Sequence, residues 1–192
     1  NRAVLQAVKN AGPLKGTMPV VRLEHGVFMP QESVETMAHL GVTASFHIHH
    51  IKYYGDALAH SVVGLLAAQQ TLPIRSAFAM PVRPTLHADS PMFQAHGFAL
   101  MQTAMNRQTG LGLLLNADQG ITAQQALRAM TINGAYQLRL QDTTGSLEVG
   151  KWADLQIVNG NPYSAPVREL DALKTLATYV NGKHQFAAPG WE

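Results

Sequence analysis

The chain has 192 residues, of which 46% are hydrophobic and 14% are charged, and its formal net charge is +2. This length provides one sizeable core or one and a half domains, and the composition is that of a buried core, which excludes a disordered chain. Cysteine is absent, which excludes disulfides and thiolate metal sites. No Lys/Arg cluster indicates nucleic acid, and no run of about 18 apolar residues indicates a membrane span.

The first part of the chain alternates helical and strand patterns. Helices are predicted over residues 2–10 and 30–40, and strands over 18–25 and 42–48. Pro30 near the start and Gly41 at the end of the second helix are the residues expected at those positions. The strand–helix–strand order is the βαβ unit, which produces a parallel sheet.

The middle of the chain is mostly helical around a third strand. Helices are predicted over residues 56–80 and 92–107, a strand over 82–88 and a loop over 110–120. Pro73 breaks the first helical pattern, where a short strand over 71–74 is an alternative. Pro84 is unfavourable inside the third predicted strand, because proline lacks the N–H that a central strand donates to its neighbour.

The last part of the chain changes from helices to strands. Thr122 and Gln125 form a capping box that opens a helix to about Met130, and a short helix follows. The short helix covers 132–138, and strands are predicted over 145–150, 153–158, 176–180 and 183–186. Asn181-Gly182 is typical of the type I′ turn of a hairpin. We therefore place a boundary near 142–146, with domains 1–143 and 144–192.

Each strand of the first part ends in side chains that can bind a metal or move a proton. These are His25 after the first strand, His47, His49 and His50 after the second, and His87 and Asp89 after the third. In a parallel barrel, the carboxyl ends of the strands form the active-site face. Imidazoles and a carboxylate that converge there indicate a divalent metal and a water to be activated.

Taken singly, these residues also have structural interpretations. An isolated histidine is often a hydrogen-bonded loop residue, and Asp89 before Ser90-Pro91 fits a turn or a helix N-cap. Tyr53 and Tyr54 after the second strand either line a substrate pocket or cover the barrel mouth. His39, near the end of a helix, is interpreted as structural.

Five stretches of the chain resemble motifs of one known family. They are Arg22–His25 (R-L-E-H), Ser45–Asp56, Thr85–Pro91, Ile121–Ala135 and Gly145–Leu155 (G-S-L-E-V-G-K-W-A-D-L). Together they resemble the C-terminal half of amidohydrolase-superfamily metal-dependent hydrolases, in particular the amidohydrolase 3 type, which includes N-substituted formamide deformylases. The resemblance covers nearly the whole chain.

The resemblance implies an α/β fold, the C-terminal half of a (β/α)8 TIM-like barrel followed by strands of a small β-sandwich domain. It implies that His25 and His50 bind a divalent metal, with Zn²⁺ as the expected ion. A shift of the alignment by one residue would select His49 instead of His50.

The resemblance also implies the chemistry. Asp89 matches the general acid/base that activates the attacking water, and His87 matches a pocket position, with Tyr53 and Tyr54 as further substrate-binding residues. The implied reaction is metal-assisted hydrolysis of a non-peptide C–N bond in an amide or formamide of small size. An ester or phosphoester substrate is an alternative.

The family's strand-1 His-x-His pair and strand-4 lysine are expected upstream of Asn1. We therefore interpret the chain as a fragment that is stable beside the missing N-terminal half of the barrel or in a homo-oligomer. A catalytically inert structural half-domain is the alternative function. We expect no nucleic-acid or membrane partner and a cytoplasmic location, unless a signal sequence lies upstream.

Overall fold

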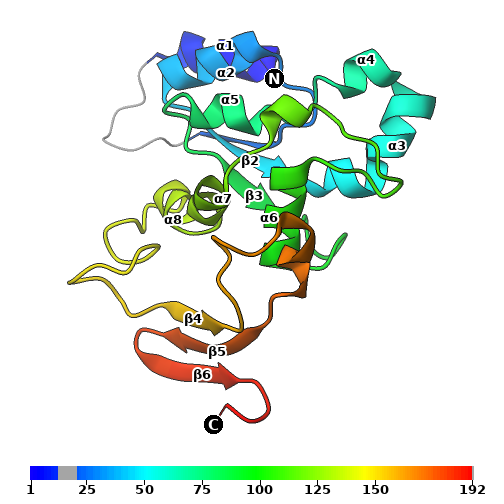
Figure 1. Cartoon of the computed structure of the whole chain (residues 1–192). Coiled ribbons are helices and arrows are strands. Elements are labelled where there is room, and N and C mark those ends of the chain that lie inside the picture. Colours follow the sequence, from blue (N-terminus) through cyan, green and yellow to red (C-terminus); the bar gives the residue numbers. More distant parts are fainter. Residues whose placement is uncertain (13–20, 192) are drawn as a thin grey trace.

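The computed structural model describes residues 1–12 and 21–191, in which two small sheets organise the chain (Figure 1). One sheet is parallel, with the strand order β1-β2-β3, and the other is antiparallel, with the order β4-β5-β6. The strands are β1 (Arg22–His25), β2 (Thr43–His47), β3 (Thr85–His87), β4 (Leu155–Val158), β5 (Thr175–Val180) and β6 (Lys183–Ala187). The predicted α/β class is confirmed.

Helices connect and cover the parallel sheet. The α-helices are α1 (Arg2–Ala11), α2 (Gln31–Leu40), α3 (Gly55–Ala57), α4 (Leu65–Ala68), α5 (Ile74–Phe78), α6 (Gly97–Asn106), α7 (Ala123–Met130) and α8 (Ile132–Gln137). The π-helical turns are η1 (His50–Tyr54) and η2 (Leu58–Val62), and the 3₁₀ turns are η3 (Ala117–Gln119) and η4 (Val167–Ala172).

The βαβ unit forms as the sequence predicts. Helix α2 buries Val34 and Met37, three residues apart and therefore on one helix face. It ends at Gly41, whose φ of 68° is the left-handed conformation that glycine adopts at low cost. The chain then enters β2, all five residues of which are buried because the strand lies between β1 and β3.

The register of the parallel sheet brings the strand ends together. Ser45 of β2 pairs with Glu24 of β1 and with Thr85 of β3, and His47 pairs with His87. Since all three strands run in the same direction, their carboxyl ends meet at one edge. That edge carries the histidines identified in the sequence.

Several predicted boundaries differ from the structure. Of the strand predicted over 18–25, β1 covers the last four residues, and positions 18–20 lie outside the described residues. The alternative strand over 71–74 is wrong, because Thr71 makes an isolated bridge to Phe28 and Ile74 begins α5. β3 begins only at Thr85, so the missing N–H of Pro84 falls just before the strand.

Two further predictions fail for local reasons. Residues 92–96 are not helical, because the His96 side chain accepts a hydrogen bond from the Ala99 N–H and so caps the start of α6. Residues 145–150 form turns rather than a strand, and Gly145 and Gly150 both have φ near 90°. Such angles interrupt an extended chain.

The antiparallel sheet contains the predicted hairpin. Asn181 and Gly182 join β5 to β6 with φ values of 49° and 73°, the two positive values that a type I′ turn needs. The capping box of α7 is also confirmed, since Thr122 and Gln125 exchange side-chain and backbone hydrogen bonds. The half-barrel, the β-sandwich and the domain boundary remain predictions.

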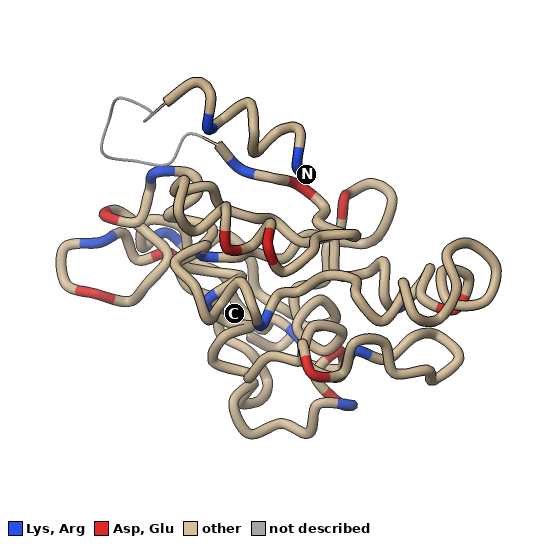
Figure 2. Tube along the Cα trace, turned by 90° about the horizontal axis from the view of Figure 1, so that it is seen from above, with Lys and Arg blue, Asp and Glu red and all other residues tan. Residues whose placement is uncertain are grey.

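The charged side chains are spread over the chain. Lys and Arg residues are interspersed with Asp and Glu along the described trace (Figure 2). Within residues 1–12 and 21–191, no helix combines the length and the apolar character that crossing a bilayer requires.

Candidate metal centre

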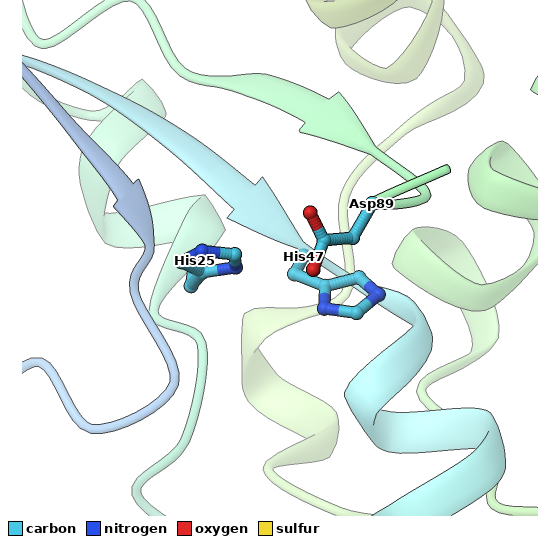
Figure 3. Close-up of side chains that lie close together, drawn as sticks. All are labelled: His25, His47 and Asp89. Atoms are coloured by element: carbon cyan, nitrogen blue, oxygen red, sulfur yellow. The ribbon is translucent and has the colours of Figure 1, made fainter. Parts of the chain in front are cut away.

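Three potential metal ligands converge at the carboxyl edge of the parallel sheet. His25 is the last residue of β1, His47 is the last residue of β2, and Asp89 follows β3 by two residues. One ligand atom from each lies within 4.8 Å of the other two, and the three side chains lie close together at the strand ends (Figure 3). Two imidazole nitrogens and a carboxylate oxygen are a donor set that suits zinc and similar divalent metals.

The backbone turns sharply at two of these residues. His25 has a φ of 69° and Asp89 has a φ of 55°, the left-handed region that residues with a β-carbon seldom adopt. Gly26, with a φ of 61°, continues the turn after β1. Strained backbone of this kind is typical of functional sites, where the geometry of a side chain outweighs the local cost.

His47 is the most buried member of the group, with 0% of its surface exposed. Within residues 1–12 and 21–191, neither of its ring nitrogens has a hydrogen-bond partner. Burial, together with the neighbouring His50 and His87, lowers the pKa of His47 to about 4, so its ring is neutral at pH 7. A neutral imidazole with a free nitrogen beside a carboxylate and a second imidazole fits a bound divalent cation.

The structure groups His47 with His25 and Asp89, whereas the resemblance implies His50 as the ligand, or His49 if the alignment shifts by one residue. His50 lies in η1, and its Nδ1–H donates to the His47 carbonyl oxygen over 3.1 Å. Among the described residues, the group of potential ligands that lie close together includes neither His50 nor His49. A metal-binding role of His50 therefore remains a prediction that this geometry does not favour.

His49 is buried apart from the metal group. It is 2% exposed, its Nδ1 has no hydrogen-bond partner among the described residues, and burial together with the Lys52 and His96 charges lowers its pKa to about 4. Its ring lies edge-on to Tyr53, with the centroids 5.2 Å apart. His49 thus packs against Tyr53.

His87 adjoins the group. Its ring centroid lies 5.2 Å from that of His25 and 5.1 Å from that of His47, and its buried Nε2 has no hydrogen-bond partner in the part of the chain that the structure describes. Burial lowers the pKa of His87. His87 and Asp89 both line a hollow of about 370 Å³. Its predicted role in substrate binding remains a prediction.

Tyr53 and Tyr54 follow His50 within η1 and are largely exposed. Sequence reasoning missed Phe93, whose ring lies parallel to that of Tyr53 at 4.4 Å and 5.4 Å from that of His47. The available signal was its position four residues after Asp89, in the loop that follows a strand end.

The fold is that of solved metal-dependent hydrolases. A metal-dependent hydrolase from Pyrococcus horikoshii superposes with a TM-score of 0.73 and 23% identity, over 87% of this chain and 33% of that one. An adenosine deaminase from Xanthomonas campestris with bound zinc gives a TM-score of 0.63 and 20% identity, over 86% and 37%.

The sequence comparison defines the family. The pattern of the amidohydrolase family matches residues 1–185, and the chain therefore belongs to that family, as its motifs predict. It is 30% identical over 171 residues to an N-substituted formamide deformylase of Arthrobacter pascens, covering 89% of this chain and 32% of that protein. It is 27% identical over 146 residues to an imidazolonepropionase of Christiangramia forsetii, covering 71% and 34%. The chain thus spans about a third of these relatives.

Proposed function

We propose that this protein is a metal-dependent hydrolase that cleaves a non-peptide C–N bond in a small amide or formamide. The observation that carries the proposal is the convergence of His25, His47 and Asp89 at one edge of the parallel sheet. Membership of the amidohydrolase family and the likeness to a formamide deformylase support the reaction class.

The proposed cofactor is Zn²⁺, held by the two imidazoles and the carboxylate. Catalytic zinc sites often have three protein ligands and an open position for substrate or water, and this donor set has that composition. The family's His-x-His pair and lysine, if present elsewhere in the protein, would add ligands. When bound, the metal supplies a Lewis acid that polarises a carbonyl group and makes water more acidic.

The residues of this chain then have different roles, and Asp89 has two of them, as a ligand of the cation and as the base. His25 and His47 hold the cation as neutral imidazoles. Asp89 takes a proton from the attacking water and passes it to the leaving nitrogen, and this is the role of the general acid/base that it matches in the family. We assign orientation of the substrate to His87, which adjoins the group, and to Tyr53 and Tyr54, which contact Phe93 beside it.

The proposal includes further strands beside the parallel sheet. β1 and β3 each pair with a single strand among the described residues, which leaves two sheet edges without partners there. Since the chain spans only about a third of the length of these relatives, we propose that additional strands of a barrel pair with these edges. The alternative function, an inert half-domain, applies if the 192 residues act without them.

The Asp89→Asn variant tests the proposal in the metal-loaded protein. The substitution keeps the shape of the side chain and removes the base, so formate release from N-substituted formamides should fall by about 10²- to 10⁴-fold. Asp118→Asn, in η3, is the matched control and should retain activity. Full activity of Asp89→Asn would end the assignment, and a metal-loaded parent protein without turnover would favour the inert alternative.

A further inference from the structure

A second cavity lies where two helices of the chain face the antiparallel sheet, and we call it the helix–sheet cavity. Its volume is about 490 Å³, which is within the range of pockets that bind small molecules. Helices α6 and α7 contribute one side, and β4, the start of β5 and the residues just before β5 contribute the other (Figure 1). The cavity therefore joins the two sheets' parts of the fold.

The helix–sheet cavity is distinct from the metal centre. The hollow that His87 and Asp89 line shares three wall residues with it, Ala95, Gly97 and Met130, but none of the proposed metal ligands lines the cavity. Met130 packs over Gly97 in this shared wall, since a β-carbon at Gly97 would lie 3.5 Å from the methyl carbon of Met130. A ligand of the cavity would thus bind beside the metal centre without contacting the proposed metal ligands.

The inner part of the helix–sheet cavity is apolar. Phe98 and Met101 of α6 are 7% and 1% exposed, so they mark its inner end. Leu127, Met130 and Leu173 are partly buried and extend the apolar surface outward from there. Because burial of apolar atoms is favourable in proportion to the buried area, an apolar chain of several carbon atoms suits this part of the cavity.

Two side chains of the lining present N–H donors. The Ala99 N–H donates to the His96 Nδ1 over 3.2 Å, so the neutral His96 ring carries its proton on Nε2. The Gln156 Oε1 accepts from the Thr175 hydroxyl over 3.2 Å, which orients this amide and leaves its Nε2 group as a donor. Both His96 and Gln156 line the cavity, so each offers a donor to an oxygen atom of a ligand.

Lys174 adds a positive charge to the same lining. Its backbone N–H donates to the Asn159 Oδ1 over 2.8 Å, and the Asn159 N–H donates to its carbonyl oxygen over 3.1 Å, so its backbone is fixed just before β5. Within residues 1–12 and 21–191, Lys174 forms no ion pair, and no Asp or Glu lines the cavity. This lining, positive and apolar, complements an anion that carries an apolar chain.

We propose that the helix–sheet cavity binds a small monocarboxylate with an apolar chain. The carboxylate pairs with Lys174, with the donors of His96 and Gln156 beside it, and the chain lies against Phe98 and Met101. An alcohol of the same length lacks the ion pair, and an ammonium of the same length is repelled by Lys174. This site goes beyond the proposed hydrolase function, because binding requires neither the metal nor turnover.

Methionine-methyl NMR on the full chain tests this proposal, with octanoate, 1-octanol and octylammonium as the probes. Octanoate should shift the Met101 methyl resonance, whereas the methyl resonance of Met37, buried in α2, should stay unchanged. The Kd for octanoate should be about threefold to tenfold lower than for 1-octanol, and octylammonium should bind more weakly than either. Equal affinities for the three probes, or no shift at Met101, would overturn the proposal.

Lysine variants test the position of the carboxylate. Lys174→Met keeps most of the side-chain length and removes the charge, so octanoate should lose its advantage over 1-octanol, whereas Lys174→Arg should retain it. Lys183→Met, at an exposed position of β6, is the matched control and should bind both probes as the parent protein does. An octanoate advantage that survives Lys174→Met would refute the assignment of the site.

Discussion

His47 and His87 are register partners on β2 and β3, and their rings stack at 27° with the centroids 5.1 Å apart. Among the residues that the structure describes, both nitrogens of His47 and the Nε2 of His87 are buried without hydrogen-bond partners. A buried polar group left unpaired costs about 1–3 kcal/mol. A cation bound at the strand ends would offset part of this cost.

The free energy of unfolding of the metal-free protein should decrease as the pH is lowered from about 6.5 to about 4. Burial is the largest cause that lowers the pKa of His47 and of His49 to about 4, whereas unfolded imidazoles titrate near 6.5. In this window the unfolded state binds more protons, so the free energy of unfolding rises with pH. The upper bound is about 3 kcal/mol for each imidazole.

Urea unfolding at pH 7, 6, 5 and 4 checks this dependence. The parent protein should lose stability at each step down in pH. Above pH 7, titration of His47 and His49 should change the stability little. His184→Asn, an exposed position on β6, should reproduce the parent slope. An unfolding free energy that is constant from pH 7 to pH 4 would refute the prediction.

Arg107→Met should destabilise the protein by about 3 kcal/mol or more. The fully buried guanidinium donates to the carbonyl oxygens of Thr71, Leu72 and Leu115 over 2.8, 3.0 and 3.1 Å. Methionine fills a similar volume but removes all three bonds: among the described residues the Leu115 carbonyl then has no donor, and the Thr71 and Leu72 carbonyls keep only the Asn116 side chain and the Ile74 N–H. Chemical denaturation measures the loss, with the exposed Arg128→Met as control, expected within about 0.5 kcal/mol of the parent. Similar stabilities of the two variants would contradict the prediction.

Gly26→Ala should weaken both the fold and the metal centre. An added β-carbon would lie 2.7 Å from two atoms of the Phe46 ring, at a φ of 61°. Gly41→Ala is a matched control, because Gly41 has a φ of 68° and open space around the same position. The control measures the conformational cost alone, about 1 kcal/mol, so Gly26→Ala should cost more.

Thermal unfolding and metal titration of both glycine variants provide the comparison. Because Gly26 follows His25 directly, its variant should also bind Zn²⁺ more weakly, while Gly41→Ala binds it normally. Equal losses in both variants would show that contact with Phe46 is unimportant.

The sequence predicts those parts of the fold that depend on local chemistry. The helix face of Val34 and Met37, the capping box at Thr122 and the turn at Asn181-Gly182 each follow from residues close together in the chain. The family could likewise be recognised from its motifs.

The choice among His47, His49 and His50 could not be made from local pattern. It depends on where β2 ends, and that end is set by pairing with β3, about 40 residues further along the chain. Phe93 was missed for a similar reason, since its stacking on Tyr53 joins the loops that follow two different strands. Contacts of this kind arise from tertiary packing, which spacing does not encode.

The most direct test of the account is the Zn²⁺ affinity of three proteins, measured by competition with a chelator: the parent, His47→Ala and His50→Ala. The grouping of His25, His47 and Asp89 predicts that His47→Ala lowers the affinity by at least tenfold and that His50→Ala has a much smaller effect. Tight binding by His47→Ala together with loss of binding by His50→Ala would contradict the proposed metal centre.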